Sequence, residues 1–164
     1  MKKVGIIMGS ASDLPVVEKA VDTLKSLDIP YEVHVFSAHR TPDAAAEFSF
    51  NAKKDGFGAI IAVAGMAAHL AGALAAKTTV PVIGVPVSGG ALDGLDALLS
   101  TVQMPSGIPV ATVALNGGAN AALLAAEIIA VSDDALYDKL DGLRKAGEEK
   151  TLKSDAEISA KFNK

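Results

Sequence analysis

The sequence predicts an α/β fold with three αβα layers around a parallel five-stranded sheet, followed by a C-terminal helical extension. Two observations predict it. Short apolar runs alternate with amphipathic helical patterns from the first residues, and several runs are almost continuously apolar, as parallel strands covered on both faces require. We expect a sheet of the flavodoxin-like or Rossmann-like kind, with strands at residues 3–8, 31–36, 59–63, 82–85 and 110–114.

Helical periodicity between the first two strands predicts a crossover helix, because apolar residues recur on one face: Leu14, Val17, Val21, Leu24 and Leu27. The next helix opens at Thr41-Pro42, an N-cap followed by proline at the first helical position, and should end near Lys54 before Asp55-Gly56. Three further helices are expected after the remaining strands, at residues 67–77, 94–102 and 118–131.

The C-terminal part of the sequence is more polar than the rest. Ser132-Asp133-Asp134 caps a charged helix expected at residues 134–149, and residues 150–164 are polar enough to fray or to pack on a neighbouring subunit. No linker or change of composition divides residues 1–131. We therefore expect one domain over the whole chain, in which that core is followed by a helical tail, residues 132–164.

Composition argues against several classes of function. With no cysteine, no signal-peptide pattern and no apolar run near the roughly 20 residues that span a bilayer, the chain is expected to be cytoplasmic. A net charge of −4 and a pI near 5.3 without basic clusters argue against nucleic acid or membrane as partners. Half of the residues are apolar but only 4% are aromatic, and this apolar surplus predicts a homo-oligomer.

Ligands of open parallel sheets bind at the carboxyl ends of the strands, so the loops there are the candidate sites. The first loop contains Ser10, Ser12 and Asp13 and opens a helix, whose N-terminus suits a phosphate. Asp13 would accept hydrogen bonds from ribose hydroxyls. The alternative is that Ser12 or Asp13 only caps the helix. The loop matches neither the Walker A nor the GxGxxG pattern, which disfavours ATP and NAD.

The second loop, residues 37–42, contains His39 next to Arg40. The imidazole can carry a proton, and the guanidinium can bind a phosphate or carboxylate through two hydrogen bonds. The alternative is that both are incidental polar residues of a surface turn. The third loop, residues 64–72, combines small residues that leave room for a flat ligand with His69, which could equally be a packing or capping group. His34 lies within a strand and is interpreted as structural.

Several common mechanisms have little support in this sequence. The three histidines lack HxH and HExxH spacing, so no metal site is expected, and no GxSxG elbow is present for serine hydrolysis. The remaining residues indicate an enzyme that acts on a phosphorylated small molecule, with proton transfer by His39.

The motifs of these loops resemble those of class I N5-carboxyaminoimidazole ribonucleotide mutases, the PurE family, over most of the chain. The first loop is similar to that family's GSxSD segment, the second reads SAHRTP, and the third contains AAHL. A VQMPxGIPVxT run also matches. The sequence departs from the family pattern at Met66 and Ala71, where glycine and proline are usual, at Ala97, where serine is frequent, and in residues 116–120, about two residues short.

The resemblance implies an isomerase of purine biosynthesis that moves a carboxyl group from N5 to C4 of the imidazole, without cofactor or metal, in a homo-octamer. It implies that His39 is the general acid and base, and that the other substrate-binding residues are Ser10, Ser12, Asp13, Ser37, Ala38, Arg40, Gly65, Ala68, His69 and Leu70. Three alternatives stay open: a class II-type carboxylase that uses free CO₂, a carboxylating enzyme for another mononucleotide, and a nucleotide-binding relative without catalysis.

Overall fold

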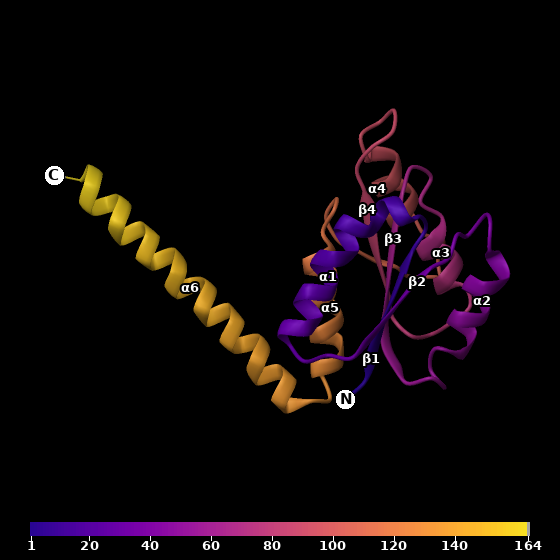
Figure 1. Ribbon diagram of the computed structural model, residues 1–164, viewed down its shortest axis with the longest axis horizontal. Helices are drawn as coiled ribbons and strands as arrows, with labels where there is room; N and C mark the ends of the chain where they lie inside the picture. The colour runs from indigo at the N-terminus through magenta and orange to yellow at the C-terminus, as the bar shows by residue number, and fades with distance from the viewer. Residues whose placement is uncertain (164) are drawn as a thin grey trace.

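The computed structural model describes residues 1–163 and contains one parallel sheet of five strands (Figure 1). The strands follow the order β2-β1-β3-β4-β5, and every neighbouring pair is parallel. Their bounds are β1 (Lys3–Met8), β2 (Tyr31–Val35), β3 (Phe57–Gly65), β4 (Val82–Val87) and β5 (Ala111–Thr112). The predicted α/β fold with a parallel sheet is confirmed.

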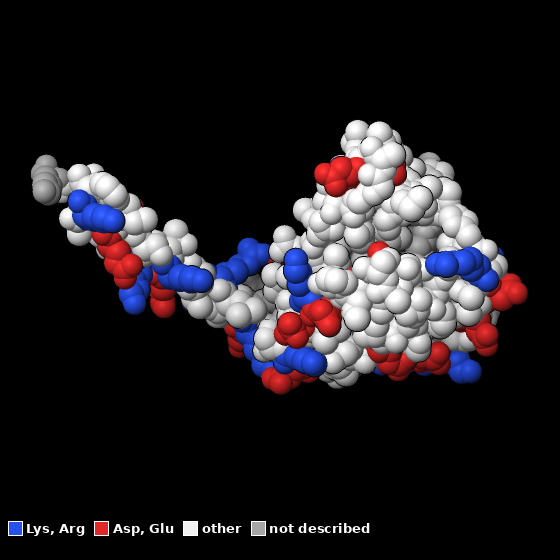
Figure 2. All heavy atoms as spheres, turned by 45° about the horizontal axis from the view of Figure 1, so that its top comes forward, with Lys and Arg blue, Asp and Glu red and all other residues white. Residues whose placement is uncertain are grey.

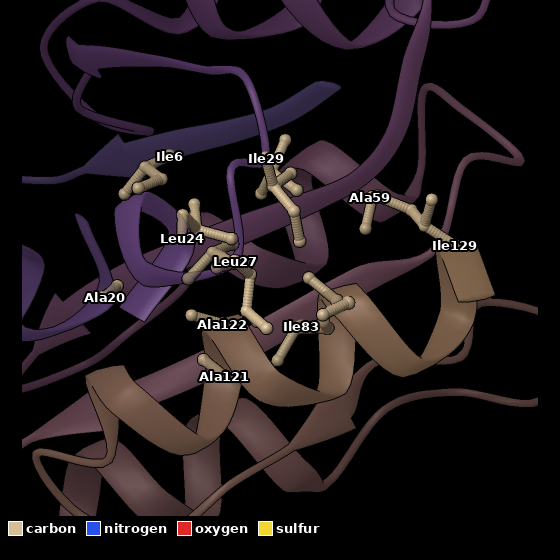
Figure 3. Close-up of a cluster of buried hydrophobic side chains, with 14 of the residues drawn as sticks. Ile6, Ala20, Leu24, Leu27, Ile29, Ala59, Ile83, Ala121, Ala122 and Ile129 are labelled. Carbon is tan, nitrogen blue, oxygen red and sulfur yellow. The ribbon is translucent and has the colours of Figure 1, made fainter. Parts of the chain in front are cut away.

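Helices cover both faces of this sheet. One face carries α1 (Leu14–Ser26) and α5 (Gly118–Ala130), and the other carries α2 (Pro42–Asn51), α3 (Leu70–Ala75) and α4 (Leu95–Val102). Two apolar cores result, because side chains alternate along each strand. Figure 3 shows the core under α1 and α5.

The order in which strands join the sheet reverses at β1, while all strands stay parallel. The chain passes from β1 to β2 on one side and then crosses to β3 on the other side. This reversal separates the loops after β1 and β3, and in parallel α/β sheets such a gap is the usual ligand site. Helix η1 (Ala11–Asp13) and then α1 begin directly after β1 at this gap.

Close packing holds α1 and α5 together on one face. At Gly118, the first residue of α5, an added Cβ would lie 2.1 Å from the backbone oxygen of Val16. A backbone atom cannot rotate away as a side chain can, so only glycine fits at this contact. The contact fixes the position of the start of α1, which borders the gap after β1.

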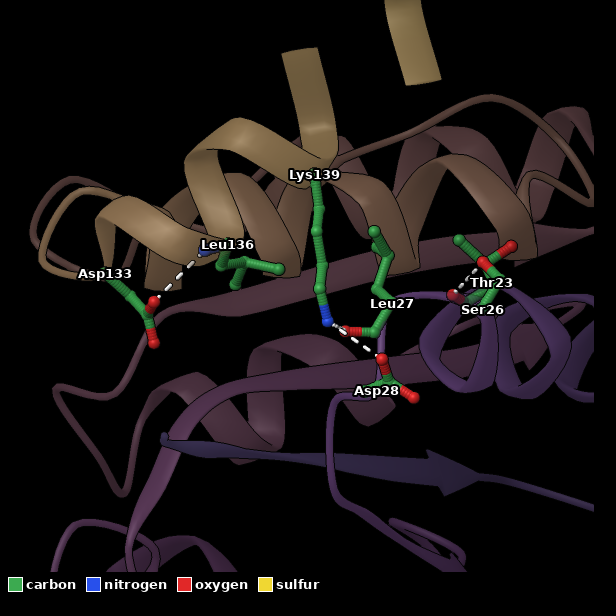
Figure 4. A network of polar contacts seen from close by, with 7 residues as sticks. All are labelled: Thr23, Ser26, Leu27, Asp28, Asp133, Leu136 and Lys139. Carbon is green, nitrogen blue, oxygen red and sulfur yellow. Dashed lines mark hydrogen bonds and ion pairs between the residues drawn. The ribbon is translucent and has the colours of Figure 1, made fainter. Parts of the chain in front are cut away.

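The C-terminal helix α6 (Asp134–Phe162) is longer than predicted and extends away from the sheet (Figure 1). Its start is anchored by Asp133, whose side chain accepts a hydrogen bond from the Leu136 N–H, and by Lys139, which contacts Asp28 at 2.8 Å and the Leu27 carbonyl (Figure 4). Of its residues, only Leu136 and Leu140 are buried within the described chain.

The expectation that the chain frays after residue 149 is wrong for residues 150–162, while Lys164 lies outside the described residues. The segment has no proline or glycine, and lysine and alanine, which favour helix, recur in it, so the helix continues without tertiary contacts. Figure 2 shows charges of both signs along it. Its expected packing on a neighbouring subunit stays a prediction. None of the helices within residues 1–163 has both the length and the apolar character that a membrane crossing requires.

Other differences from the predicted boundaries follow from local chemistry. The predicted strand 110–114 is only two residues long, because Ile83 and Gly84 alone pair with it in the ladder. Helix α3 starts at Leu70 rather than at residue 67, because the Ala67 carbonyl accepts from the nearby His69 N–H, and the Ala73 N–H bonds instead to the His69 carbonyl, which makes His69 the N-cap. Helix α2 ends at Asn51, three residues before the predicted end.

Candidate active site

A cleft of about 610 Å³ lies at the carboxyl ends of the strands, across the gap between β1 and β3. It is lined by side chains and backbone from four loops, within residues 9–13, 37–40, 64–70 and 87–90. The first three are the loops that the sequence identified as candidate sites. Residues from separate parts of the chain therefore meet at one site.

The loop after β1 forms a capping box at the start of η1. Ser10 Oγ accepts hydrogen bonds from the Ser12 N–H at 3.4 Å and the Ser12 hydroxyl at 3.0 Å, and Asp13 Oδ2 accepts one from the Ser10 N–H at 3.2 Å. Asp13 stands at the N-cap position of α1, as the alternative proposed, but its side chain makes no capping hydrogen bond there; the residue that caps a helix in this loop is Ser10, at the start of η1. All three also line the cleft, so capping and ligand binding are compatible.

Asp13 is the one carboxyl group of this loop, and it is buried. Burial raises the pKa of Asp13 above its usual value, while the hydrogen bonds from the Ser10 backbone and the Ser12 side chain act in the opposite direction. The carboxyl group is therefore easier to protonate than an exposed aspartate. A group of this kind can accept hydrogen bonds from a ligand hydroxyl at the cleft wall.

The loop after β2 is ordered by Ser37. Its hydroxyl accepts hydrogen bonds from the backbone N–H of His39 at 3.3 Å and of Arg40 at 3.2 Å. The guanidinium Nη2 of Arg40 donates to the Gly9 carbonyl at 3.2 Å, which ties this loop to the one after β1. With Ala38, these residues line the cleft. The arginine is consequently held where an anion at the α1 N-terminus would meet it.

Two histidines from different loops meet in the cleft. His39 Nε2 lies 2.8 Å from His69 Nδ1, and the two rings are 5.0 Å apart in an edge-to-face arrangement. At this distance one nitrogen must donate a proton and the other must accept it. The two imidazoles therefore share a hydrogen bond and can pass one proton between them. By contrast, His34 stacks on Phe36 outside the cleft, as its structural interpretation predicted.

The loop after β3 provides the remaining wall. Gly65 and Leu70 line the cleft, whereas Ala68 is only 2% exposed and is not among the lining residues. The N–H of Ala68 donates to Ser100 Oγ at 2.9 Å, so this hydrogen bond holds the loop against α4. His69, the next residue, is held in place by that anchor.

Some residues of the cleft were not among those predicted from sequence. Ser88, Gly89 and Gly90 follow β4 and close one side of the cleft. Asn116 holds this loop: its Oδ1 accepts a hydrogen bond from the Ser88 N–H at 3.0 Å, and its Nδ2 donates one to the Ser88 hydroxyl at 2.7 Å. The rule that singled out the first three loops, applied to the fourth strand, would have found Ser88 to Gly90. Neither Ser100 nor Asn116 carries a sequence signal of its own.

The donor set of this region does not favour a metal. Within the described residues, no three histidine, cysteine, aspartate or glutamate side chains lie close enough together to hold an ion. The cleft instead offers hydroxyl, guanidinium and imidazole groups. Such groups suit an anionic ligand and proton transfer.

Comparison with known proteins agrees with this geometry. The AIR carboxylase family profile matches residues 3–150. The chain belongs to the AIR carboxylase family. It is 55% identical over 144 residues to the N5-carboxyaminoimidazole ribonucleotide mutase of Pyrococcus abyssi, covering 88% of this chain and 83% of the relative. It is 53% identical over 157 residues to that of Methanocaldococcus jannaschii, covering 96% and 98%.

A solved member of the family has the same fold. The crystal structure of Treponema denticola PurE superimposes with a TM-score of 0.86 and 30% sequence identity over 98% of each chain. The resemblance drawn from the sequence motifs is confirmed, and so is the parallel α/β architecture predicted from the alternation of strand and helix patterns.

Proposed function

We propose that this chain is an N5-carboxyaminoimidazole ribonucleotide mutase, an isomerase that forms 4-carboxy-5-aminoimidazole ribonucleotide in purine (IMP) biosynthesis. Relatives that match nearly the whole chain carry that name. The observation that carries the proposal is the hydrogen-bonded pair of His39 and His69 in a cleft that also holds anion-binding groups. One proton carrier is what this isomerisation needs.

The substrate's phosphate binds at the start of η1 and α1. The hydroxyls of Ser10 and Ser12 and the backbone N–H groups there donate hydrogen bonds, and Arg40 supplies the positive charge. The Asp13 carboxyl group accepts from the ribose hydroxyls. We therefore expect the imidazole ring of the nucleotide to lie further into the cleft, toward the wall formed by Gly65 and Leu70.

The reaction is an exchange of one carboxyl group and one proton. Cleavage of the bond between N5 and the carboxyl carbon releases CO₂ and leaves the electron pair on N5, which takes a proton from His39. C4 then attacks CO₂, a carbon–carbon bond forms, and the C4 proton returns to His39. Protons and electrons balance, so neither an oxidant nor a second substrate is needed. A positioned imidazole typically contributes a rate factor of about 10²–10⁴ to such transfers.

His69 orients the proton carrier. Its Nδ1 is 2.8 Å from His39 Nε2, so it fixes the ring of His39 and shares its proton. The small residues around the pair keep the reacting carboxyl group in an apolar environment, which favours neutral CO₂ over the carboxylate.

We also propose the state in which the enzyme works: a single catalytic domain in a cytoplasmic homo-octamer that needs no cofactor or metal. Large apolar side chains on and beside α4 are exposed in the isolated chain, and subunit contacts would cover them: Leu92, Leu95, Leu99, Val102 and Leu115. Helix α6 likewise exposes Leu152 and Ile158. Both surfaces suit contact with other copies of the chain.

Turnover assays with two substrates test this proposal. We expect the purified chain to convert N5-carboxyaminoimidazole ribonucleotide without added bicarbonate. Product that forms only from aminoimidazole ribonucleotide and added bicarbonate would identify a carboxylase instead. Nucleotide binding without turnover of either substrate would identify a non-catalytic relative.

A histidine substitution tests the assigned role within the same assay. His39→Asn should lower kcat by about 10²-fold or more while product binding, measured by calorimetry, stays close to that of the parent. His34→Asn is the matched control, because that histidine lies outside the cleft. Equal loss of activity in both variants would contradict the role of His39.

A further inference from the structure

One residue at the mouth of the cleft has an unusual backbone conformation. Met66 has a φ of 55°, in the left-handed region that residues with a Cβ rarely adopt, and the residue is 67% exposed. A strained backbone that carries an exposed apolar side chain at a ligand site indicates a functional constraint.

The side chain of Met66 lies against the neighbouring loop after β4 at the cleft mouth. An added Cβ at Gly90 would lie 3.6 Å from Met66 Cγ, so the loop after β3 and the loop after β4 approach each other here. Gly90 has a φ of 72°, a conformation that favours glycine, so no side chain stands between its backbone and the methionine. Both residues line the cleft.

Other apolar groups cannot provide this cover. The two other large apolar residues of the cleft, Leu70 and Val87, are buried or half-buried in its walls. The remaining residues near the mouth are small, including Ala67 and Gly89. Methionine is flexible and fills irregular space, so it can lie over a bound ligand and still let it pass.

We propose that Met66 is an apolar cap that keeps released CO₂ in the cleft until C4 attacks it. The proposal rests on the proposed mutase function, in which the carbon–nitrogen bond breaks before the carbon–carbon bond forms. In that interval CO₂ either is captured by C4 or escapes to solvent. An apolar side chain across the mouth slows escape and excludes water, and so raises the fraction of turnovers that end in product.

The retention of a labelled carboxyl group tests the cap. The substrate carries ¹³C in its N5-carboxyl group, the solution contains excess unlabelled bicarbonate, and the ¹³C content of the product is measured by mass spectrometry. An enzyme-free sample corrects for spontaneous loss. The variants are Met66→Gly, which removes the cap and suits the left-handed backbone, and Met66→Leu, which keeps an apolar side chain of similar size.

The quantity compared is the ratio of ¹³C lost to ¹³C retained in the product. We expect this ratio to be about tenfold higher for Met66→Gly than for the parent, which corresponds to a barrier to CO₂ escape lower by about 1.4 kcal/mol. Met66→Leu should retain label as the parent does. The backbone control is Asp28→Gly, because Asp28 has a similar φ of 58° and is not among the residues that line the cleft. Its label retention should equal that of the parent.

Four outcomes overturn the cap. The first is equal label retention by Met66→Gly and the parent. The second is loss of label by Met66→Leu to the extent seen with glycine. The third is a change in the assembly mass of Met66→Gly, measured by light scattering, because Met66 would then be a subunit contact. The fourth is a parent that does not turn the substrate over, and only this result also overturns the proposed function.

Discussion

The hydroxyl of Ser100 connects α4 to the loop that carries His69. It accepts a hydrogen bond from the Ala68 N–H at 2.9 Å and lies 2.7 Å from the Asp96 carbonyl, to which it donates. Ala68 is 2% exposed, so water cannot replace the serine. In Ser100→Ala the buried N–H loses its partner, and we expect the free energy of unfolding to fall by about 1–3 kcal/mol.

The same substitution should slow catalysis. Ala68 immediately precedes His69, and a displacement of about 1 Å at a reacting group can cost about 10²-fold in rate. We therefore expect kcat of Ser100→Ala to fall by about 10- to 100-fold, with a smaller change in KM. The contact between His69 and His39, 2.8 Å in the structure, should lengthen.

Urea denaturation and steady-state kinetics measure the two effects. Ser154→Ala is the matched control, because Ser154 also donates to the carbonyl four residues earlier, at 3.0 Å, but is exposed on α6. Its effect should stay within about 0.5 kcal/mol. An unchanged unfolding free energy in Ser100→Ala would refute the anchor. A destabilised variant with the parent's kcat would refute the link from that anchor to His69.

Three further predictions concern the pair, the helix packing and the buried carboxyl group. His69→Ala should lower kcat by about 10²-fold while leaving the fold intact by circular dichroism; full activity would remove His69 from the mechanism. Gly118→Ala places a methyl group against the Val16 carbonyl and should destabilise the protein by about 2 kcal/mol or more, whereas Gly147→Ala, with open space around it, should stabilise it by up to about 1 kcal/mol. Equal thermal shifts would contradict the close packing. Burial raises the pKa of Asp13, so the folded state binds the proton of this carboxyl group more tightly than the unfolded chain does. The protonated carboxyl group therefore stabilises the fold fully below the unfolded pKa near 3.8, and this stabilisation is lost as pH rises through the folded pKa. Asp13→Asn should therefore gain stability relative to the parent over that pH range, as denaturation at several pH values would show; a constant difference would contradict it.

Sequence periodicity was sufficient for the type and order of the elements, because each strand and helix carries its own apolar pattern. It failed where tertiary contacts decide the boundary. The last strand, expected at 110–114, pairs only at Ala111 and Thr112, and no local pattern reports how far a neighbouring strand extends. Beyond residue 149 the helix continues to Phe162 on intrinsic propensity, although the polar composition of this part suggested fraying.

The sequence predicted those parts of the candidate site that lie at the carboxyl ends of the strands, where parallel sheets bind ligands. That rule brought Ser10, Arg40 and His69 into one cleft from separate segments. It could not give the contact between the two histidines, which depends on side-chain directions 30 residues apart in sequence. Nor could it reveal Ser100, whose anchoring role depends on how α4 packs beneath the loop.

A crystal structure with the product nucleotide bound tests the central claim most directly. The account predicts the phosphate at the α1 N-terminus beside Ser10, Ser12 and Arg40, with the imidazole of His39 against C4 of the five-membered ring. A product whose ring lies away from His39, with another acid or base beside C4, would contradict it.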